Sequence, residues 1–207
     1  MRIDVSKIKL QTSWGRIHTR PLEIKDFKKW VESEQSRLPK RHQFDRDPDN
    51  LKELAKSNFK KMLSTYRKAR SIDKNYNFAV FEKKTGNIIG NFYICPGMRW
   101  NIQSCTVGYG IHNARWGQGF GKETLSAAIE VALYKLKFYR VEAHVHPSNK
   151  VSIALARSVG MRKEGRLKGF NTHNKKRVDN FVFAITAPEW GIPTYHPKYG
   201  ISLNELV

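Results

Sequence analysis

A glycine-rich turn between a strand and a long helix constrains this chain more than any other feature of its sequence. The turn covers residues 115–123 and reads RWGQGFGKE. Residues 105–111 before it are predicted to form a strand, and residues 121–137 after it place apolar side chains at i, i+3, i+4 and i+7, as an amphipathic helix does. Glycines let an anion approach the backbone, and free N–H groups and the helix dipole favour phosphate at such a junction. The sequence therefore predicts an anion-binding loop.

The spacing within this loop excludes two classes of nucleotide site. A Walker A loop needs a glycine separated by four residues from Gly-Lys-Ser/Thr, but that position is Trp116 and Lys122 is followed by Glu123. A dinucleotide fingerprint needs Gly-x-Gly-x-x-Gly, and here the spacing is Gly-x-Gly-x-Gly. The strands expected before the loop also form a hairpin meander rather than a βαβ unit. A nucleotide triphosphatase is excluded, and a dinucleotide enzyme is disfavoured.

Periodicity and turn signals along the chain predict an α+β domain with a mixed, mostly antiparallel sheet flanked by helices. A second helix is expected to start at Asp49 or Asn50 and to run to about residue 70, and Gly160 is expected to end a later one. We expect one domain over 1–187 and a tail packed on it over 188–207. The remaining helices are predicted at 25–35 and 149–159, and the strands at 17–22, 78–81, 88–94, 105–111, 139–146, 161–167 and 181–186.

Charge is the unusual bulk property of the chain. The chain has 38 Lys and Arg residues and 18 Asp and Glu residues, which gives a formal net charge of +20. Such an excess favours polyanionic partners such as RNA or the ribosome, and it disfavours polycationic substrates. No apolar run is long enough to cross a membrane, and the first residues lack the apolar centre of a signal peptide. We therefore expect a cytoplasmic protein, monomeric or homodimeric, without a membrane partner.

The two cysteines give no sign of a metal site. Cys95 and Cys105 lack metal-ligand spacing and are too few for a disulfide framework. We expect both to be small buried side chains in a reducing compartment, with no metal bound.

The loop sequence WGQGFGKETL strongly resembles the acetyl-CoA pyrophosphate loop of the GCN5-related N-acetyltransferases. The order of elements is similar to that family over roughly residues 15–190. The strand segment 107–111 (VGYGI) looks like the family strand whose backbone faces the thioester. The segments 147–152 (PSNKVS), 159–161 (VGM) and 164–165 (EG), together with Asp179, Glu189 and Trp190, look like its ribosomal-protein acetyltransferase branch.

This resemblance implies acetyl-CoA as the acyl donor and assigns roles to individual residues. The amide near Tyr109 would polarise the thioester carbonyl as an oxyanion donor. Asn149 would bind the pantetheine arm, and Ser152 would help to protonate the leaving thiolate. An alternative for Asn149 is helix capping, with Ser152 as a first-turn polar residue, and the two roles can coexist. The cofactor contacts implied are Tyr109, Gly110, Ile111, Trp116, Gly117, Gln118, Gly119, Phe120, Gly121, Lys122, Asn149 and Ser152.

The general base is the gap in this resemblance. Many relatives carry a glutamate two residues before the Gly-Tyr of the strand, where this chain has Thr106. Glu142, His144 and His146 lie at period two on the next predicted strand, and a histidine there could relay a proton. His146, next to Pro147 at the cofactor end, is the favoured one. A partly buried polar strand face is the alternative for each of the three.

The absence of a glutamate at position 106 indicates which kind of amine accepts the acetyl group. An α-amine, with a pKa near 8, is neutral in about 10% of molecules at pH 7. A lysine amine, with a pKa near 10.4, is neutral in fewer than about 0.1% of molecules, so it depends more on a general base. We therefore expect transfer of acetyl to the N-terminal α-amine of a protein, such as a ribosomal protein, by direct attack. Two alternatives stay open. One is an acetyltransferase for a small amine or an aminoacyl-tRNA, and the other is a non-catalytic RNA- or ribosome-binding module with the same fold.

Overall fold

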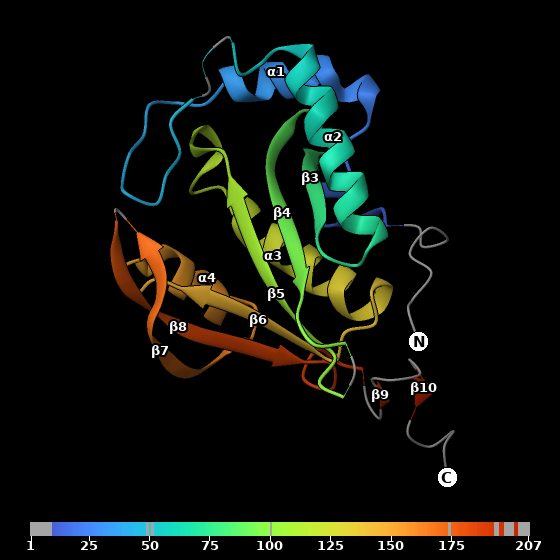
Figure 1. Cartoon of the computed structure of the whole chain (residues 1–207), viewed down its shortest axis with the longest axis vertical. Coiled ribbons are helices and arrows are strands. Elements are labelled where there is room, and N and C mark those ends of the chain that lie inside the picture. Colours follow the sequence, from blue (N-terminus) through green and yellow to red (C-terminus); the bar gives the residue numbers. More distant parts are fainter. Residues whose placement is uncertain are drawn as a thin grey trace. The chain divides into compact units, whose positions relative to one another are not determined.

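The computed structural model describes residues 10–48, 50, 52–99, 101–173, 175–192, 195–196 and 201–202. The chain divides into two compact units, and Figure 1 labels their helices and strands. The first comprises residues 1–93 and 109–127, and the second residues 94–108 and 128–207. The single domain predicted over 1–187 stays a prediction. The tail predicted over 188–207 lies largely outside the described residues.

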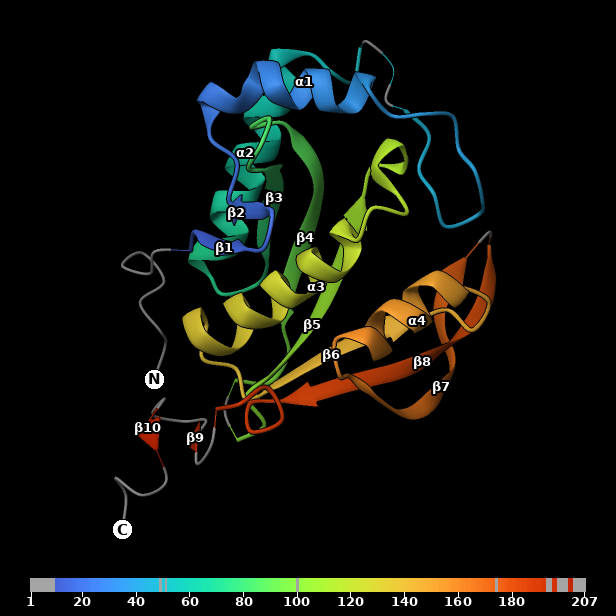
Figure 2. The same ribbon diagram turned by 180° about the vertical axis from the view of Figure 1, so that it is seen from behind.

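The first unit contains the helices predicted for the N-terminal half and the strands of the meander. Strand β1 pairs with β2, and β2 with β3, both antiparallel. Helices α1 and α2 lie on one side of β3 and β4, and the start of α3 lies on the other side (Figure 2). Its elements are β1 (Thr12–Trp14), β2 (Ile17–Arg20), the 3-10 turn η2 (Ile24–Asp26), α1 (Phe27–Gln35), α2 (Lys56–Ser71), β3 (Tyr76–Glu82) and η3 (Asn113–Arg115), with parts of β4 (Ile88–Pro96), β5 (Ser104–Ile111) and α3 (Phe120–Glu130).

The second unit is built on strands in the order β5-β6-β8-β7. Strand β5 pairs with β6 in parallel, whereas β6–β8 and β8–β7 are antiparallel. Helix α4 covers one face of this group of strands, as both ribbon views show (Figure 2). Its further elements are the π-helical turn η4 (Val131–Lys135), β6 (Arg140–Val145), α4 (Lys150–Ser158), β7 (Arg162–His173), β8 (Lys176–Thr186), β9 (Tyr195–His196) and β10 (Ile201–Ser202).

Strands β1 to β8 follow the hydrogen-bonded order β1-β2-β3-β4-β5-β6-β8-β7. The pair β5–β6 is parallel, whereas β1–β2, β2–β3, β6–β8 and β8–β7 are antiparallel, so the sheet is mixed and mostly antiparallel. This confirms the fold class that the sequence predicts.

The predicted start of the second helix is wrong, for a reason visible in the structure. Asn50 and Glu53 form reciprocal hydrogen bonds, in which the Glu53 amide donates to Asn50 Oδ1 (3.0 Å) and the Asn50 amide donates to Glu53 Oε2 (3.2 Å). This is a capping box, but it closes only one turn. Ala55 is extended at ψ 143°, and α2 begins at Lys56. Asp49, the other predicted cap, lies outside the described residues.

The long amphipathic helix also ends differently from the prediction. Helix α3 stops at Glu130, and residues 131–135 form a π-helical turn before Leu136. Leu125, Ile129 and Leu133 are completely buried. A π turn adds a residue to one helical turn, so apolar side chains keep facing the core although the 3.6-residue period is interrupted.

A buried ion pair ties β2 to the start of α1 in the first unit. Asp26 is 3% exposed, and its carboxylate accepts two hydrogen bonds from the guanidinium of Arg20 (2.6 and 2.7 Å) and one from the Glu23 amide (2.8 Å). Burial alone would raise the pKa of the Asp26 carboxyl, but the hydrogen bonds from Arg20 and Glu23 outweigh it and lower that pKa. Arg20 also lies over the ring of Phe81 at 4.4 Å.

We predict that Asp26→Asn lowers the free energy of unfolding by about 3 kcal/mol, because it leaves a partly buried guanidinium without its counter-charge. Glu32→Gln is the matched control on α1. Glu32 and Lys28 are 3.9 Å apart and both exposed, so its effect should stay within about 0.5 kcal/mol. Urea denaturation at pH 7 measures both variants, and equal losses would contradict the assignment.

The same pair predicts a pH dependence. Because the folded-state pKa of Asp26 is depressed, its carboxylate stabilises the fold above the unfolded pKa of about 3.8. The contribution is lost as the pH falls through the lower folded value. The difference in stability between the wild type and Asp26→Asn should therefore shrink below about pH 4.

Candidate functional site

The glycine loop of the first unit has the backbone conformation that its sequence requires. Gly117 and Gly119 have φ angles of +75° and +84°, values that L side chains rarely adopt. A Cβ placed on Gly117 would meet no atom within 4 Å, so open space lies beside the backbone there. A Cβ on Gly119 would lie 3.2 Å from an Arg16 nitrogen. The loop is open at the first glycine and supported at the second.

Arg16 supports the loop from a position more than 100 residues away in sequence. Its guanidinium donates to the carbonyl oxygen of Gln118 (2.6 Å) and to Glu123 Oε1 (2.7 Å), and it lies 4.3 Å from the centroid of the Phe120 ring. The amide of Arg16 also donates to Glu123 Oε2 (2.7 Å). Because the C=O and N–H of one peptide point in opposite directions, the N–H of Gly119 points away from Arg16.

The first turn of α3 supplies further donors. The N–H groups of Phe120 and Gly121 have no partner inside the helix, because the residues four positions before them precede α3. The positive end of the helix dipole adds to them, and Lys122 is exposed beside them. Arg115, in contrast, contacts Glu82 (3.1 Å), which partly neutralises its charge. The backbone of this loop therefore suits a bound anion such as a pyrophosphate.

Trp116 and Asn113 hold a second loop against this region, which the sequence did not predict. The side chain of Asn113 is buried (2% exposed). Its Oδ1 accepts a hydrogen bond from the Leu38 backbone N–H (2.8 Å), and its Nδ2 donates to the Leu38 carbonyl (2.7 Å) and to Asp45 Oδ2 (3.0 Å). The His42 ring stacks on Trp116 at 5.0 Å. The indole Nε1 of Trp116 donates to the carbonyl of Ile111 (2.7 Å). The segment between α1 and α2 is thus fixed to the strand–loop junction.

The end of β5 leads directly into this loop. Tyr109, Gly110 and Ile111 are all partly exposed. Gly90 on β4 has no room for a side chain, because a Cβ there would lie 2.4 Å from the carbonyl oxygen of Gly110. His112, 3% exposed, follows the strand. Burial, with help from Arg37 and Arg46, lowers its pKa to about 3, so His112 stays neutral near pH 7.

The predicted pantetheine residues lie in the second unit, at the start of α4. Asn149 is the N-cap of this helix, and its Oδ1 accepts a hydrogen bond from the Ser152 amide (3.1 Å). The capping alternative for Asn149 is therefore confirmed, and it leaves the Asn149 NH₂ group able to donate. Gly160 has φ +87° just beyond the end of the helix, as a C-terminal glycine cap requires.

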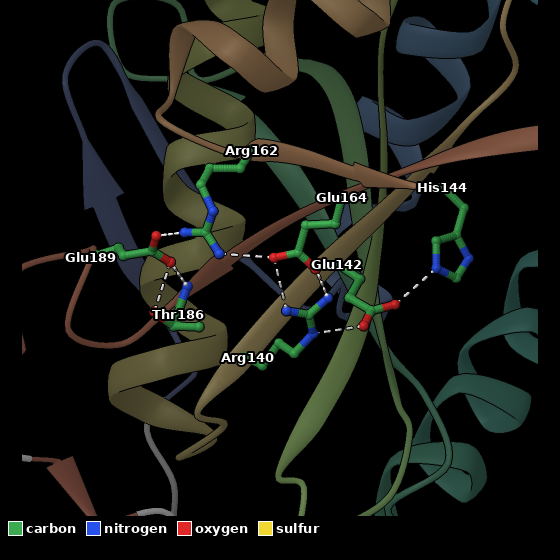
Figure 3. A network of polar contacts seen from close by, with 7 residues as sticks. All are labelled: Arg140, Glu142, His144, Arg162, Glu164, Thr186 and Glu189. Atoms are coloured by element: carbon green, nitrogen blue, oxygen red, sulfur yellow. Dashed lines mark hydrogen bonds and ion pairs between the residues drawn. The ribbon is translucent and has the colours of Figure 1, made fainter. Parts of the chain in front are cut away.

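The three candidate proton acceptors also lie in the second unit, on β6 and just after it. The Nδ1 of His146 accepts from the Ser148 amide (3.1 Å) and contacts Ser148 Oγ (2.8 Å), in a local turn. Glu142 contacts His144 (2.9 Å) and Arg140 (2.8 Å), as Figure 3 shows.

Within the described ranges, no group of three or more His, Cys, Asp or Glu residues could hold a metal ion. In the same residues, every helix is too short or too polar to cross a membrane. Of the two cysteines, Cys105 is buried and Cys95 is partly buried, and both are free thiols.

Comparison with known proteins agrees with this geometry. Residues 16–162 match the model of the acetyltransferase (GNAT) domain. The chain is 28% identical over 130 residues to the probable N-acetyltransferase YjcK of Bacillus subtilis, which covers 63% of this chain and 72% of that protein. It is 30% identical over 115 residues to the [ribosomal protein uS5]-alanine N-acetyltransferase of Escherichia coli, covering 56% of this chain and 59% of the relative.

Solved structures show the same fold. Mycobacterium smegmatis RimJ in complex with CoA-disulfide superposes with a TM-score of 0.69 at 23% identity, over 84% of this chain and 83% of that one. The chain therefore belongs to the GNAT acetyltransferase family and is an N-acetyltransferase. The family uses acetyl-CoA, and the loop at residues 117–121 suits the pyrophosphate of that donor.

We predict that Gly117→Ala weakens CoA binding by about 10-fold, or 1.4 kcal/mol, because the methyl group enters the open space where the anion approaches the backbone. Gly191→Ala is the matched control. Gly191 has φ +89° and also no atom within 4 Å of its Cβ position, so the backbone strain is similar. Calorimetric titration with CoA measures both variants. Equal affinity in the two variants would refute the assignment of the loop.

Proposed function

We propose that this protein transfers the acetyl group of acetyl-CoA to the N-terminal α-amine of a protein, such as a ribosomal protein, in the cytoplasm. Two observations support the acceptor class. The Escherichia coli relative is named for acetylation of an alanine of ribosomal protein uS5. The β5 position Thr106 has no carboxylate that could deprotonate a lysine amine, and an α-amine needs less help to become neutral.

In this proposal the glycine loop binds the donor, and acetyl-CoA supplies the thioester. The backbone N–H groups of Gly117, Gly119 and Gly121 contact the pyrophosphate, and Lys122 adds positive charge. Arg16 fixes the loop by binding the Gln118 carbonyl. Trp116, Gln118 and Phe120 complete the cofactor contacts of this segment.

The chain's own groups then act on the reacting atoms. An amide of the segment Tyr109–Ile111 donates to the thioester oxygen, where negative charge develops when the amine attacks. Asn149 donates to the pantetheine arm with the NH₂ group that its capping role leaves available. The Ser152 hydroxyl gives a proton to the leaving thiolate, and one of the two histidines on or just after β6, His144 or His146, takes one from the amine.

A contact with RNA or with the ribosome is supported by one helix of the first unit. Helix α2 is 16 residues long and carries six Lys or Arg residues and no acidic residue. Its first turn has no acid to balance the helix dipole, and like charges at i, i+4 repel one another. A polyanion on this face would relieve the repulsion, so we propose that α2 binds RNA.

The acceptor assignment predicts a specific pattern of acetylation. A peptide that begins with alanine and carries an internal lysine should be acetylated at its N-terminus alone. The same peptide with a blocked N-terminus, used as the control, should release no CoA thiol. Mass spectrometry locates the group, and comparison of protein N-termini in cells with and without this protein identifies the natural acceptor. Acetylation of the lysine, or of a small amine in preference to any peptide, would contradict the proposal.

Replacement of four exposed α2 cations by glutamine should weaken RNA binding and lower the slope of log K against log salt by up to about 4. The residues are Lys60, Lys61, Arg67 and Lys68. The matched control removes the same charge from exposed positions elsewhere, namely Lys84, Lys137, Lys175 and Lys176.

If the α2 substitutions and the control substitutions weaken RNA binding equally, RNA affinity depends on the net charge of the protein and not on α2.

A further inference from the structure

One face of β6 carries a row of polar groups that the proposed function does not use. Arg140, Glu142 and His144 occupy every second position of the strand, and their side chains are 16–24% exposed. The alternate residues are buried at 6% or less, namely Val141, Ala143 and Val145. Because side chains alternate along a strand, the polar row lies on the face opposite to these apolar side chains.

Glu142 divides its two carboxylate oxygens between its neighbours in this row. Oε1 accepts from Arg140 Nε (2.8 Å), and Oε2 contacts His144 Nε2 (2.9 Å), as drawn in Figure 3. Partial burial alone would raise the pKa of Glu142, but the hydrogen bonds from Arg140 and His144 outweigh it and lower that pKa. Glu142 is therefore an anion at neutral pH.

An ionised carboxylate decides which nitrogen of His144 can take a proton. Since a carboxylate only accepts hydrogen bonds, Nε2 must carry the hydrogen that points at Glu142, and Nδ1 is the basic atom. The ring is also fixed by Phe170, which meets it edge-on at 4.7 Å and 85°. A side-chain exposure of 16% leaves the imidazole in reach of solvent.

The groups around this pair come from three further strands. On β7, Glu164 accepts from the guanidinium of Arg140 and from Arg162 (2.8 Å), and Arg162 in turn pairs with Glu189 after β8. On β8, the register partner of His144 is Val182, which has no charge. On β5, Thr106 is in register with Glu142 and contributes no charge. Glu142 is thus the carboxylate that contacts the imidazole, and Arg140 fixes Glu142.

We propose that His144 takes the proton that leaves the acceptor nitrogen, with Glu142 as its positioning residue. This inference rests on the N-acetyl transfer of the proposed function but not on the identity of the acceptor. As the N–C bond forms and the C–S bond breaks, the proton on nitrogen moves to His144 Nδ1 and then to solvent. The thiolate of CoA takes its own proton from Ser152, which regains one from water. His146, whose Nδ1 accepts from Ser148, is then not the proton acceptor.

The kinetic test uses any amine, peptide or small molecule, that the wild type acetylates. We expect His144→Ala to lower kcat by about 100-fold without changing the KM for acetyl-CoA, and added imidazole to restore part of the loss. Glu142→Gln should lower kcat by a smaller factor, without rescue by imidazole. A purely structural role of His144 would not respond to imidazole, so an absence of rescue in a folded variant overturns the proposal.

Two further variants sharpen the comparison. Glu189→Gln breaks the same charge network at its far end (Figure 3) and should leave kcat within about twofold of the wild type. A similar loss in this variant would mean that the network serves only the fold. If His146→Ala loses more activity than His144→Ala, His146 is the proton acceptor and the proposal is wrong, while the proposed function stands.

A third measurement does not require an acceptor. The nitrogen chemical shifts of ¹⁵N-histidine should show His144 as the Nε2–H tautomer in the wild type, with this preference lost in Glu142→Gln. Observation of the Nδ1–H tautomer in the wild type would overturn the proposal. If a small amine is acetylated in preference to any peptide and the Nε2–H tautomer is found, the proposed acceptor class has failed and the role of His144 has not.

Discussion

The contact between Arg16 and the glycine loop is the interaction on which the donor site depends. A loop with two residues at positive φ has many conformations in solution, and a phosphate can use its amides only if they point outward together. Arg16 fixes one carbonyl of the loop and the first acidic side chain of α3 at the same time. Arg16 directly precedes the segment Ile17 to Arg20, which pairs with β3, so the sheet holds in place the side chain that fixes the loop.

The fold and parts of the site could be predicted from the sequence because local rules determine them. The glycines of the loop, the Asn149 cap and the Gly160 end all follow from backbone conformations that few residues adopt. The start of α2 could not be predicted, since the capping box at Asn50 is genuine but closes only one turn. The π turn after Glu130 depends on how the largely buried helix packs in the core, and the apolar periodicity of the sequence does not reveal it.

The residues that the sequence did not single out are those that act over long separations. Arg16 and Asn113 each contact partners 68 to 107 residues away, and neither belongs to a motif. Likewise, period two placed Glu142 and His144 on one side of a strand, but only the structure shows that they share a hydrogen bond. The net charge predicts a polyanionic partner but not the surface that would bind it, because some cations are paired with acidic side chains, as Arg115 is with Glu82.

In the segment between α1 and α2, a few anchoring contacts fix the backbone, and the exposed side chains between these contacts can vary. Asn113 binds mainly backbone atoms of this segment, and Trp116 needs only a flat ring at position 42. Lys40 and Arg41 are exposed and lie between these anchors. Substitutions at these two positions can therefore alter the charge of this surface while the anchors keep the backbone in place. The surface of this segment can thus change without any change in the loop that follows β5.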